Sequence, residues 1–217
     1  THCESSAASD VYKRQMQDMS KIPILFDADI EYGLHQRFPK GTDLLPLMAI
    51  AATNNPNNAY DIGKIIAKES RAVGIHWNFS PVVDVNNNPA NPIINVRSFS
   101  EDPDMVIDYG IQFMKGLQDH GMLATAKHFP GHGDTETDSH SSLAMISSDS
   151  LRLWTLEIPP FQSMINSGVD AVMVGHIHAP DYQPDSDIPA SMDPFWVNDI
   201  LRNRLNFNGA IVTDGMG

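Results

Sequence analysis

Side chains that can carry charge or transfer protons follow five short apolar segments of this 217-residue chain. The segments span residues 22–26, 75–85, 122–127, 170–175 and 209–213, and their nearly continuous apolar character predicts strands buried on both faces, as in a parallel sheet. The polar residues at their carboxyl ends are Asp29, Asp84, Lys127, His128, His176 and Asp214. Because parallel strands bring their carboxyl ends to one side of a fold, these side chains are expected to share an active site.

The segments between these strands carry the start and stop signals of helices. Proline in the first turn and glycine past the last turn predict helices over 56–74, 103–121 and 159–168. Asp193 before Pro194 is expected to cap a fourth helix that runs to about Arg204. Strand and helix alternate without a hairpin signal, so the sequence predicts an α/β fold with a parallel sheet.

The densest group of reactive side chains is the segment 127–140, KHFPGHGDTETDSH. One interpretation is a metal site, in which His128, His132 and His140 act with Asp134 or Asp138. The spacing is unlike that of helical metal-binding motifs, and Pro130 with two glycines prevents a regular helix here, which disfavours this interpretation. The other interpretation is acid/base catalysis, in which the Asp138 carboxylate orients the His140 imidazole and raises its pKa.

Composition and charge narrow the classes of partner. The chain has 14 Lys and Arg against 27 Asp and Glu, a net charge of −13, and so acidic a surface disfavours binding to nucleic acid. No apolar run approaches the roughly 18 residues that a membrane span needs. The single cysteine, Cys3, cannot form an internal disulfide. Nothing in the sequence indicates the oligomeric state.

The segment 127–140 also carries a family resemblance, together with NFSPVVDV at 78–85, INVRSF at 94–99 and VTDGMG at 212–217. These motifs resemble family 3 glycoside hydrolases, within them the β-N-acetylglucosaminidase branch. The resemblance covers residues 16–217 and implies a (β/α)₈ barrel, which needs about 250 residues and eight strands. We therefore expect residues 16–217 to be a partial barrel that lacks strands at both ends, and residues 1–15 to be an uninformative leader.

The resemblance also implies roles for individual residues. Asp214 matches the nucleophile, and Asp138 with His140 matches the acid/base dyad of a retaining enzyme that releases terminal β-linked N-acetylglucosamine without a metal or other cofactor. The residues expected to bind the sugar or line its pocket are Asp29, Arg37, Asp84, Arg97, Lys127, His128 and His176. The early family pattern D-x-E-G-G-x-x-x-R appears as Asp29, Glu31, Gly33 and Arg37, with Tyr32 in place of its first glycine.

Three alternatives stay open at the level of sequence. The first is a family 3 β-glucosidase or xylosidase, the second a catalytically inactive carbohydrate-binding protein, and the third a metallohydrolase. Because an imidazole base is neutral after donating its proton, an anionic acceptor such as phosphate would meet no negative charge on it. Phosphate is therefore a hypothetical competitor of water.

Overall fold

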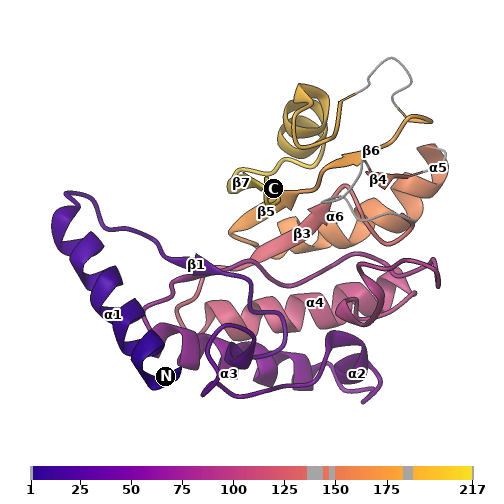
Figure 1. Ribbon diagram of the computed structural model, residues 1–217. Coiled ribbons are helices and arrows are strands. Elements are labelled where there is room, and N and C mark those ends of the chain that lie inside the picture. Colours follow the sequence, from indigo (N-terminus) through magenta and orange to yellow (C-terminus); the bar gives the residue numbers. More distant parts are fainter. Residues whose placement is uncertain (1, 136–143, 147–149, 183–187, 217) are drawn as a thin grey trace.

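The computed structural model describes residues 2–135, 144–146, 150–182 and 188–216 (Figure 1). Its main strands are all parallel to their neighbours. They are β1 (Asp27–Ala28), β2 (Trp77–Asn78), β3 (Thr125–Phe129), β5 (Ala171–Val174) and β7 (Ala210–Thr213). A second, smaller parallel pair joins β4 (Ala144–Met145) to β6 (Ile177–His178).

The order of the main strands in space follows their order along the chain. β1 pairs with β2, parallel bridges at Trp77–Leu123 and Val82–Lys127 connect the β2 segment to the β3 segment, and β3 continues to β5 and β7. Helices α3 (Asn57–Ala72), α4 (Pro103–Gln118) and α6 (Ile158–Asn166) form three of the connections. The predicted α/β class with parallel strands is confirmed.

The helices begin and end where their local chemistry requires. Asp102 accepts a hydrogen bond from the Asp104 amide at 3.0 Å, Pro103 occupies the first turn of α4, and Gly121 follows its end with φ of 77°. Gly74 and Gly168 end α3 and α6 with positive φ in the same way. The helices predicted over 56–74, 103–121 and 159–168 are therefore confirmed.

The helix predicted after Asp193 is present as η4 (Phe195–Arg204), a helical segment with π-type hydrogen bonding. Asp193 accepts a hydrogen bond from the Phe195 amide at 2.9 Å. The remaining helical elements are α1 (His2–Met19), α2 (Leu47–Ala51), α5 (Ser150–Arg152), the 3₁₀ turns η1 (Leu34–Gln36) and η2 (Asn95–Arg97), and the π-helical turn η3 (Leu153–Glu157). Among the described helices, none combines the length and the apolar character that crossing a membrane requires.

Close helix packing depends on two glycines. A Cβ atom on Gly63 of α3 would lie 2.3 Å from the carbonyl oxygen of Phe113, and one on Gly116 of α4 would lie 2.2 Å from that of Tyr60. Neither distance leaves room for a side chain, so the two helix backbones meet at these positions. This contact fixes α3 against α4 below the strands.

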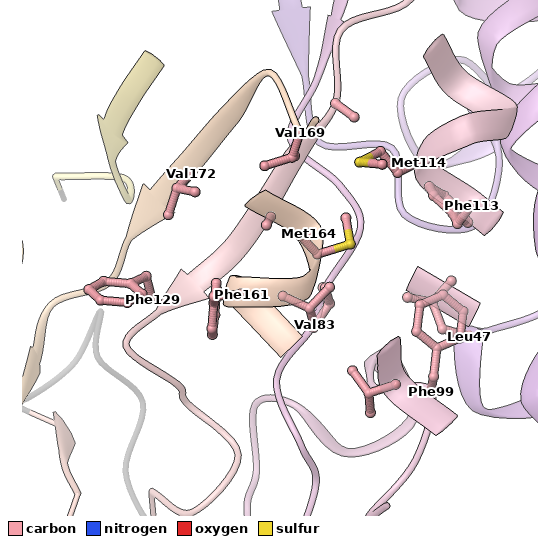
Figure 2. Close-up of a cluster of buried hydrophobic side chains, with 14 of the residues drawn as sticks. Leu47, Val83, Phe99, Phe113, Met114, Phe129, Phe161, Met164, Val169 and Val172 are labelled. Atoms are coloured by element: carbon pink, nitrogen blue, oxygen red, sulfur yellow. The ribbon is translucent and has the colours of Figure 1, made fainter. Parts of the chain in front are cut away.

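The hydrophobic core fills the space between the strands and these helices (Figure 2). Phe113 on α4 and Met164 on α6 are fully buried there, and Phe129 at the end of β3 meets Phe161 of α6 edge to face with ring centroids 5.3 Å apart. Each such side chain contributes about 1.5–3 kcal/mol by leaving water. The core thereby holds the strand that carries the 127–140 motif.

Three strand predictions were wrong in their limits. The run 75–85 contains only the two-residue strand β2 (Trp77–Asn78), so Asp84 lies six residues past the end of this strand. The first strand lies at 27–28, after the apolar run 22–26, because pairing begins only where the Phe26 carbonyl accepts hydrogen bonds from the amides of His76 and Trp77. The third strand spans 125–129, so Lys127 and His128 lie inside it. Apolar character marks burial, whereas strand limits depend on partners distant in sequence.

Candidate active site

A pocket of about 580 Å³ opens at the carboxyl ends of the main strands. Its polar wall combines residues after β1, in η2, within and after β3, and after β7, while Phe79, Ile93 and Met173 contribute apolar surface. The predicted site residues in this wall are Asp29, Arg37, Arg97, Lys127, His128 and Asp214. Asp138 and His140 lie outside the described residues.

Glu31 joins the two principal cations of the pocket. Its carboxylate accepts hydrogen bonds from Arg97 Nε at 2.9 Å and Nη2 at 2.7 Å, and one of its oxygens lies 2.8 Å from Lys127 Nζ. Burial by itself would raise the pKa of Glu31, but the charge of Lys127 and the hydrogen bonds and charge of Arg97 outweigh it and hold the pKa well below its usual range. Glu31 is therefore an anionic anchor that orients both cations.

Asp29 lies on the exposed side of the same network. Its carboxylate contacts Lys127 Nζ at 2.9 Å and Arg37 Nη2 at 3.5 Å. The side chains of Asp29 and Arg37 are 45% and 49% exposed, whereas that of Lys127 is only 3% exposed. Lys127 is thus held by its ion pair with the buried Glu31, while the more exposed Asp29 and Arg37 present charged groups to the pocket.

Asp84 supports the pocket from beneath. Its side chain is fully buried, and it accepts hydrogen bonds from His128 Nδ1 at 2.7 Å and from the His132 amide at 2.7 Å. Burial would raise the pKa of Asp84, but the charge and hydrogen bonds of the two histidines lower it overall. Because His128 Nδ1 donates to Asp84, Nε2 of His128 is left facing Arg97 Nη2 at 3.4 Å and the pocket.

Arg97 and His132 respond to the same charges. Burial would lower the pKa of Arg97, but the hydrogen bonds and charge of Glu31, with smaller effects from Asp84 and Asp214, raise it. For His132, burial and then the neighbouring His128 lower the pKa, against the opposing effect of Asp84 and Asp214. Asp214 lines the same pocket as Arg97 and His132, and its charge raises the pKa of both groups.

Asp214 is positioned by the sheet. Its amide donates to the Val174 carbonyl at 3.0 Å, which continues the pairing of β7 with β5 by one residue. Its side-chain oxygen then accepts a hydrogen bond from the Gly215 amide at 2.8 Å. The carboxylate is half-buried in the pocket wall, so it can meet a ligand held there.

His176 has a different position from the one predicted. Its Nδ1 lies 2.6 Å from Ser191 Oγ and its Nε2 lies 3.2 Å from the Gly215 carbonyl oxygen, and it is absent from the residues that line the pocket. His176 thus braces the main chain beside Asp214. Whether His176 lines the pocket or contacts the neighbouring main chain depends on tertiary contacts, which its position at a strand end does not reveal.

Glu31, His132 and Gln36 also line the pocket. Sequence reasoning assigned no site role to Glu31 or Gln36, and considered His132 only as a ligand in the disfavoured metal interpretation. The side chain of Gln36 accepts hydrogen bonds from the amides of Glu31 at 2.7 Å and Tyr32 at 3.0 Å, which fixes the chain after β1. The signal for Glu31 was its position two residues after Asp29. Across the described ranges, no group of three His, Cys, Asp or Glu side chains is arranged to hold a metal ion.

The comparison with known proteins identifies the family. The profile of the glycosyl hydrolase family 3 N terminal domain matches residues 2–217. The chain is 38% identical over 208 residues to a beta-N-acetylglucosaminidase/beta-glucosidase of Cellulomonas fimi, a match that covers 92% of this chain and 37% of that relative. The chain therefore belongs to glycoside hydrolase family 3.

Two further relatives agree with this assignment. A beta-hexosaminidase of Stenotrophomonas maltophilia strain K279a is 38% identical over 202 residues, which cover 90% of this chain and 59% of the relative. The solved structure of a family 3 beta-N-acetylglucosaminidase from Paenibacillus sp. str. FPU-7 superimposes with a TM-score of 0.91 at 38% identity, covering 96% of this chain and 40% of that one. The chain thus spans 37% to 59% of the length of these three proteins.

Proposed function

We propose that this chain forms the sugar-binding part of a retaining β-N-acetylglucosaminidase that removes terminal β-linked N-acetylglucosamine from cell-wall or chitin-derived saccharides. The observation that carries the proposal is the placement of the Asp214 carboxylate in the same pocket wall as Arg97, Lys127 and His128. The three relatives described above, named for hexosaminidase or N-acetylglucosaminidase activity, support this substrate class.

In this proposal Asp214 attacks the anomeric carbon and forms a covalent glycosyl-enzyme. Lys127, Arg97 and Nε2 of His128 hydrogen-bond to the hydroxyl and acetamido groups and hold the sugar ready for attack. Their prior fixation by Glu31 and Asp84 reduces the entropy lost when the sugar binds. Asp29 and Arg37 complete the polar wall.

The acid/base step is assigned to Asp138 and His140. His140, oriented by Asp138, protonates the leaving oxygen and then takes a proton from the incoming water. The described chain leaves the pocket wall at Thr135, a buried residue whose hydroxyl lies 2.5 Å from Nδ1 of the wall residue His132. Asp138 and His140 follow Thr135 by three and five positions in the sequence, close enough along the chain for the dyad to serve the pocket.

We further propose that residues 16–217 are part of a (β/α)₈ barrel completed by other segments of a longer protein. Two observations support this: the parallel strands neighbour one another in chain order, and the relatives are longer than the chain. The interpretation of residues 1–15 as a leader stays a prediction; helix α1 spans His2–Met19.

The direct test is the turnover of p-nitrophenyl glycosides by the full-length protein. The proposal predicts that β-N-acetylglucosaminide is cleaved with a higher kcat/KM than β-glucoside or β-xyloside, and that Asp214→Ala abolishes cleavage. Preference for the glucoside or xyloside would support the alternative, a family 3 β-glucosidase or xylosidase. The name of the Cellulomonas fimi relative includes beta-glucosidase as well as beta-N-acetylglucosaminidase. Binding of the sugar without turnover would support an inactive carbohydrate-binding protein.

A further inference from the structure

Glu157, at the end of η3, packs directly beneath the turn that follows β3. The residue is 2% exposed. A Cβ atom on Gly131 would lie 2.8 Å from both Cβ and Cγ of Glu157, so the turn at Gly131 and the Glu157 side chain leave no space between them. Any displacement of this side chain must therefore be transmitted to the turn.

The polar end of Glu157 is incompletely paired for a carboxylate. Oε1 lies 3.5 Å from Asn87 Nδ2 and 3.8 Å from Arg152 Nε. Oε2 of Glu157 and Oδ1 of Asn87 are both buried, and each has no hydrogen-bond partner within the part of the chain that the structure describes. Burial raises the pKa of Glu157 to about 7, with Asp134 adding to the effect and Arg152 and Asn87 opposing it.

Among the residues that the structure describes, two charged groups face Glu157 from the elements packed around it. Arg152 comes from α5 and Asp134 from the segment after β3, while the segment after Val85 contributes the neutral Asn87. Arg152 Nη2 contacts Asp134 at 2.9 Å, closer than its Nε lies to Glu157. An ionised Glu157 would compete with Asp134 for this guanidinium, whereas a neutral Glu157 leaves the Arg152–Asp134 pair intact.

The segment 131–135 connects this cluster to the pocket. The Gly131 amide donates to the His128 carbonyl at 2.8 Å, and the His132 amide donates to Asp84 at 2.7 Å. Asp134, in the same segment, forms an ion pair with Arg152. The segment thus runs from the residues that position His128 toward residues 136–143, which include both members of the proposed dyad.

We propose that Glu157 is a positioning residue whose neutral carboxyl group holds the segment 131–135 in place, and whose ionisation draws Arg152 from Asp134 and loosens this segment. This inference rests on the proposed function and deepens it, because the position of the segment 131–135 would tune the placement of His128 in the sugar-binding wall. The effect of Glu157 ionisation on the segment 131–135 can be measured without any substrate.

The test compares Glu157→Gln with the natural full-length protein by amide hydrogen exchange of residues 131–135, corrected for intrinsic rates. In the natural protein, protection is expected to fall roughly tenfold between about pH 6 and pH 8.5 as the carboxyl group ionises. Glu157→Gln, which cannot ionise, should keep its protection. Glu101→Gln, which alters an exposed glutamate, is the matched control and should behave like the natural protein.

A second variant covers the case in which Glu157→Gln fails to fold. Asn87→Leu removes the amide donor that favours the ionised carboxylate and leaves the Arg152–Asp134 pair in place, so the loss of protection should move to higher pH. No loss of protection in the natural protein, an equal loss in Glu157→Gln, or a midpoint in Asn87→Leu that stays the same or moves to lower pH would overturn the proposal. Because the readout needs no substrate, these outcomes are separate from failure of the proposed activity. With activity present, the kcat/KM of Glu157→Gln relative to the natural protein should rise with pH above about 7.

Discussion

Replacing Glu31 with glutamine is expected to lower both the stability of the protein and its activity. Glutamine keeps the size of the side chain, but it has one acceptor oxygen and directs an amide group at donors. Glu31 accepts hydrogen bonds from Arg97 at 2.7 and 2.9 Å and contacts Lys127 at 2.8 Å. The variant therefore leaves two cations beside a neutral group in a buried site.

The size of the effect follows from the burial of the network. Removing one partner of a buried ion pair costs about 3–5 kcal/mol. Lys127 keeps its contact with Asp29 at 2.9 Å and the Arg97 side chain is 27% exposed, so the low end of that range applies. A loss of about 3 kcal/mol in the free energy of unfolding corresponds to a fall of roughly 6–12 °C in Tm for a domain of this size.

The stability lost in Glu31→Gln should depend on pH in a way that identifies its cause. Because the folded protein holds the pKa of Glu31 below the ordinary value of 4.5, its contribution to stability is fully present above that pH. The contribution is lost as the pH falls toward the lower pKa of the folded state. The stability difference between the natural protein and Glu31→Gln should therefore be constant near neutrality and shrink below about pH 4.5.

The assay is chemical denaturation of the full-length proteins across this pH range, combined with kinetics on p-nitrophenyl β-N-acetylglucosaminide. The kcat/KM of Glu31→Gln should fall roughly 10- to 100-fold, because both cations lose their shared anchor. Glu101→Gln is the control for removal of an exposed carboxylate and should change neither quantity. Native stability and native kinetics in Glu31→Gln would refute the assignment of Glu31 as the anchor.

Three further predictions concern other parts of the molecule. Burial raises the pKa of Glu157 from 4.5 to about 7 in the folded protein, so between these pH values the folded chain keeps a proton that the unfolded chain releases. The free energy of unfolding of the natural protein should therefore fall by about 3 kcal/mol relative to that of Glu157→Gln as the pH rises through this range, measured by chemical denaturation. Gly116→Ala should cost about 1–3 kcal/mol because its Cβ would meet the Tyr60 carbonyl at 2.2 Å; an unchanged Tm would contradict the packing of α3 on α4. If His140 is the base, phosphate at high concentration should yield sugar-1-phosphate, detectable by ³¹P NMR, and its absence would remove phosphate as an acceptor.

The sequence predicted the fold where local chemistry decides the structure. Proline and glycine at helix ends located α3, α4 and α6, because these residues act through their own backbone preferences. The apolar runs predicted β5 and β7 closely, since both strands lie within them. The limits of β1 and β3 depend on which partner residues are opposite, and apolar character carries no information about that.

The candidate site was predictable to the extent that strand ends define it. That rule predicted Asp29, Lys127, His128 and Asp214, which share one pocket. It could not distinguish His176, which braces the main chain at Gly215, from a residue of the wall. The anchoring role of Glu31 depends on contacts with distant residues, which spacing along the chain does not show.

Two predictions concern parts of the protein beyond the described residues. Asp138 and His140 lie outside the described residues, so their dyad stays a prediction. The closed eight-stranded barrel stays a proposal as well, although the parallel strands follow one another in chain order.

We propose Asp214 as the nucleophile of a retaining N-acetylglucosaminidase. The most direct measurement is peptide mass spectrometry of the full-length protein after incubation with a ring-fluorinated N-acetylglucosaminyl fluoride, which forms the glycosyl-enzyme faster than water removes it. We expect one covalent sugar on the Asp214 carboxylate and none in Asp214→Asn. A label on a different carboxylate, or release of product with inverted anomeric configuration, would contradict it.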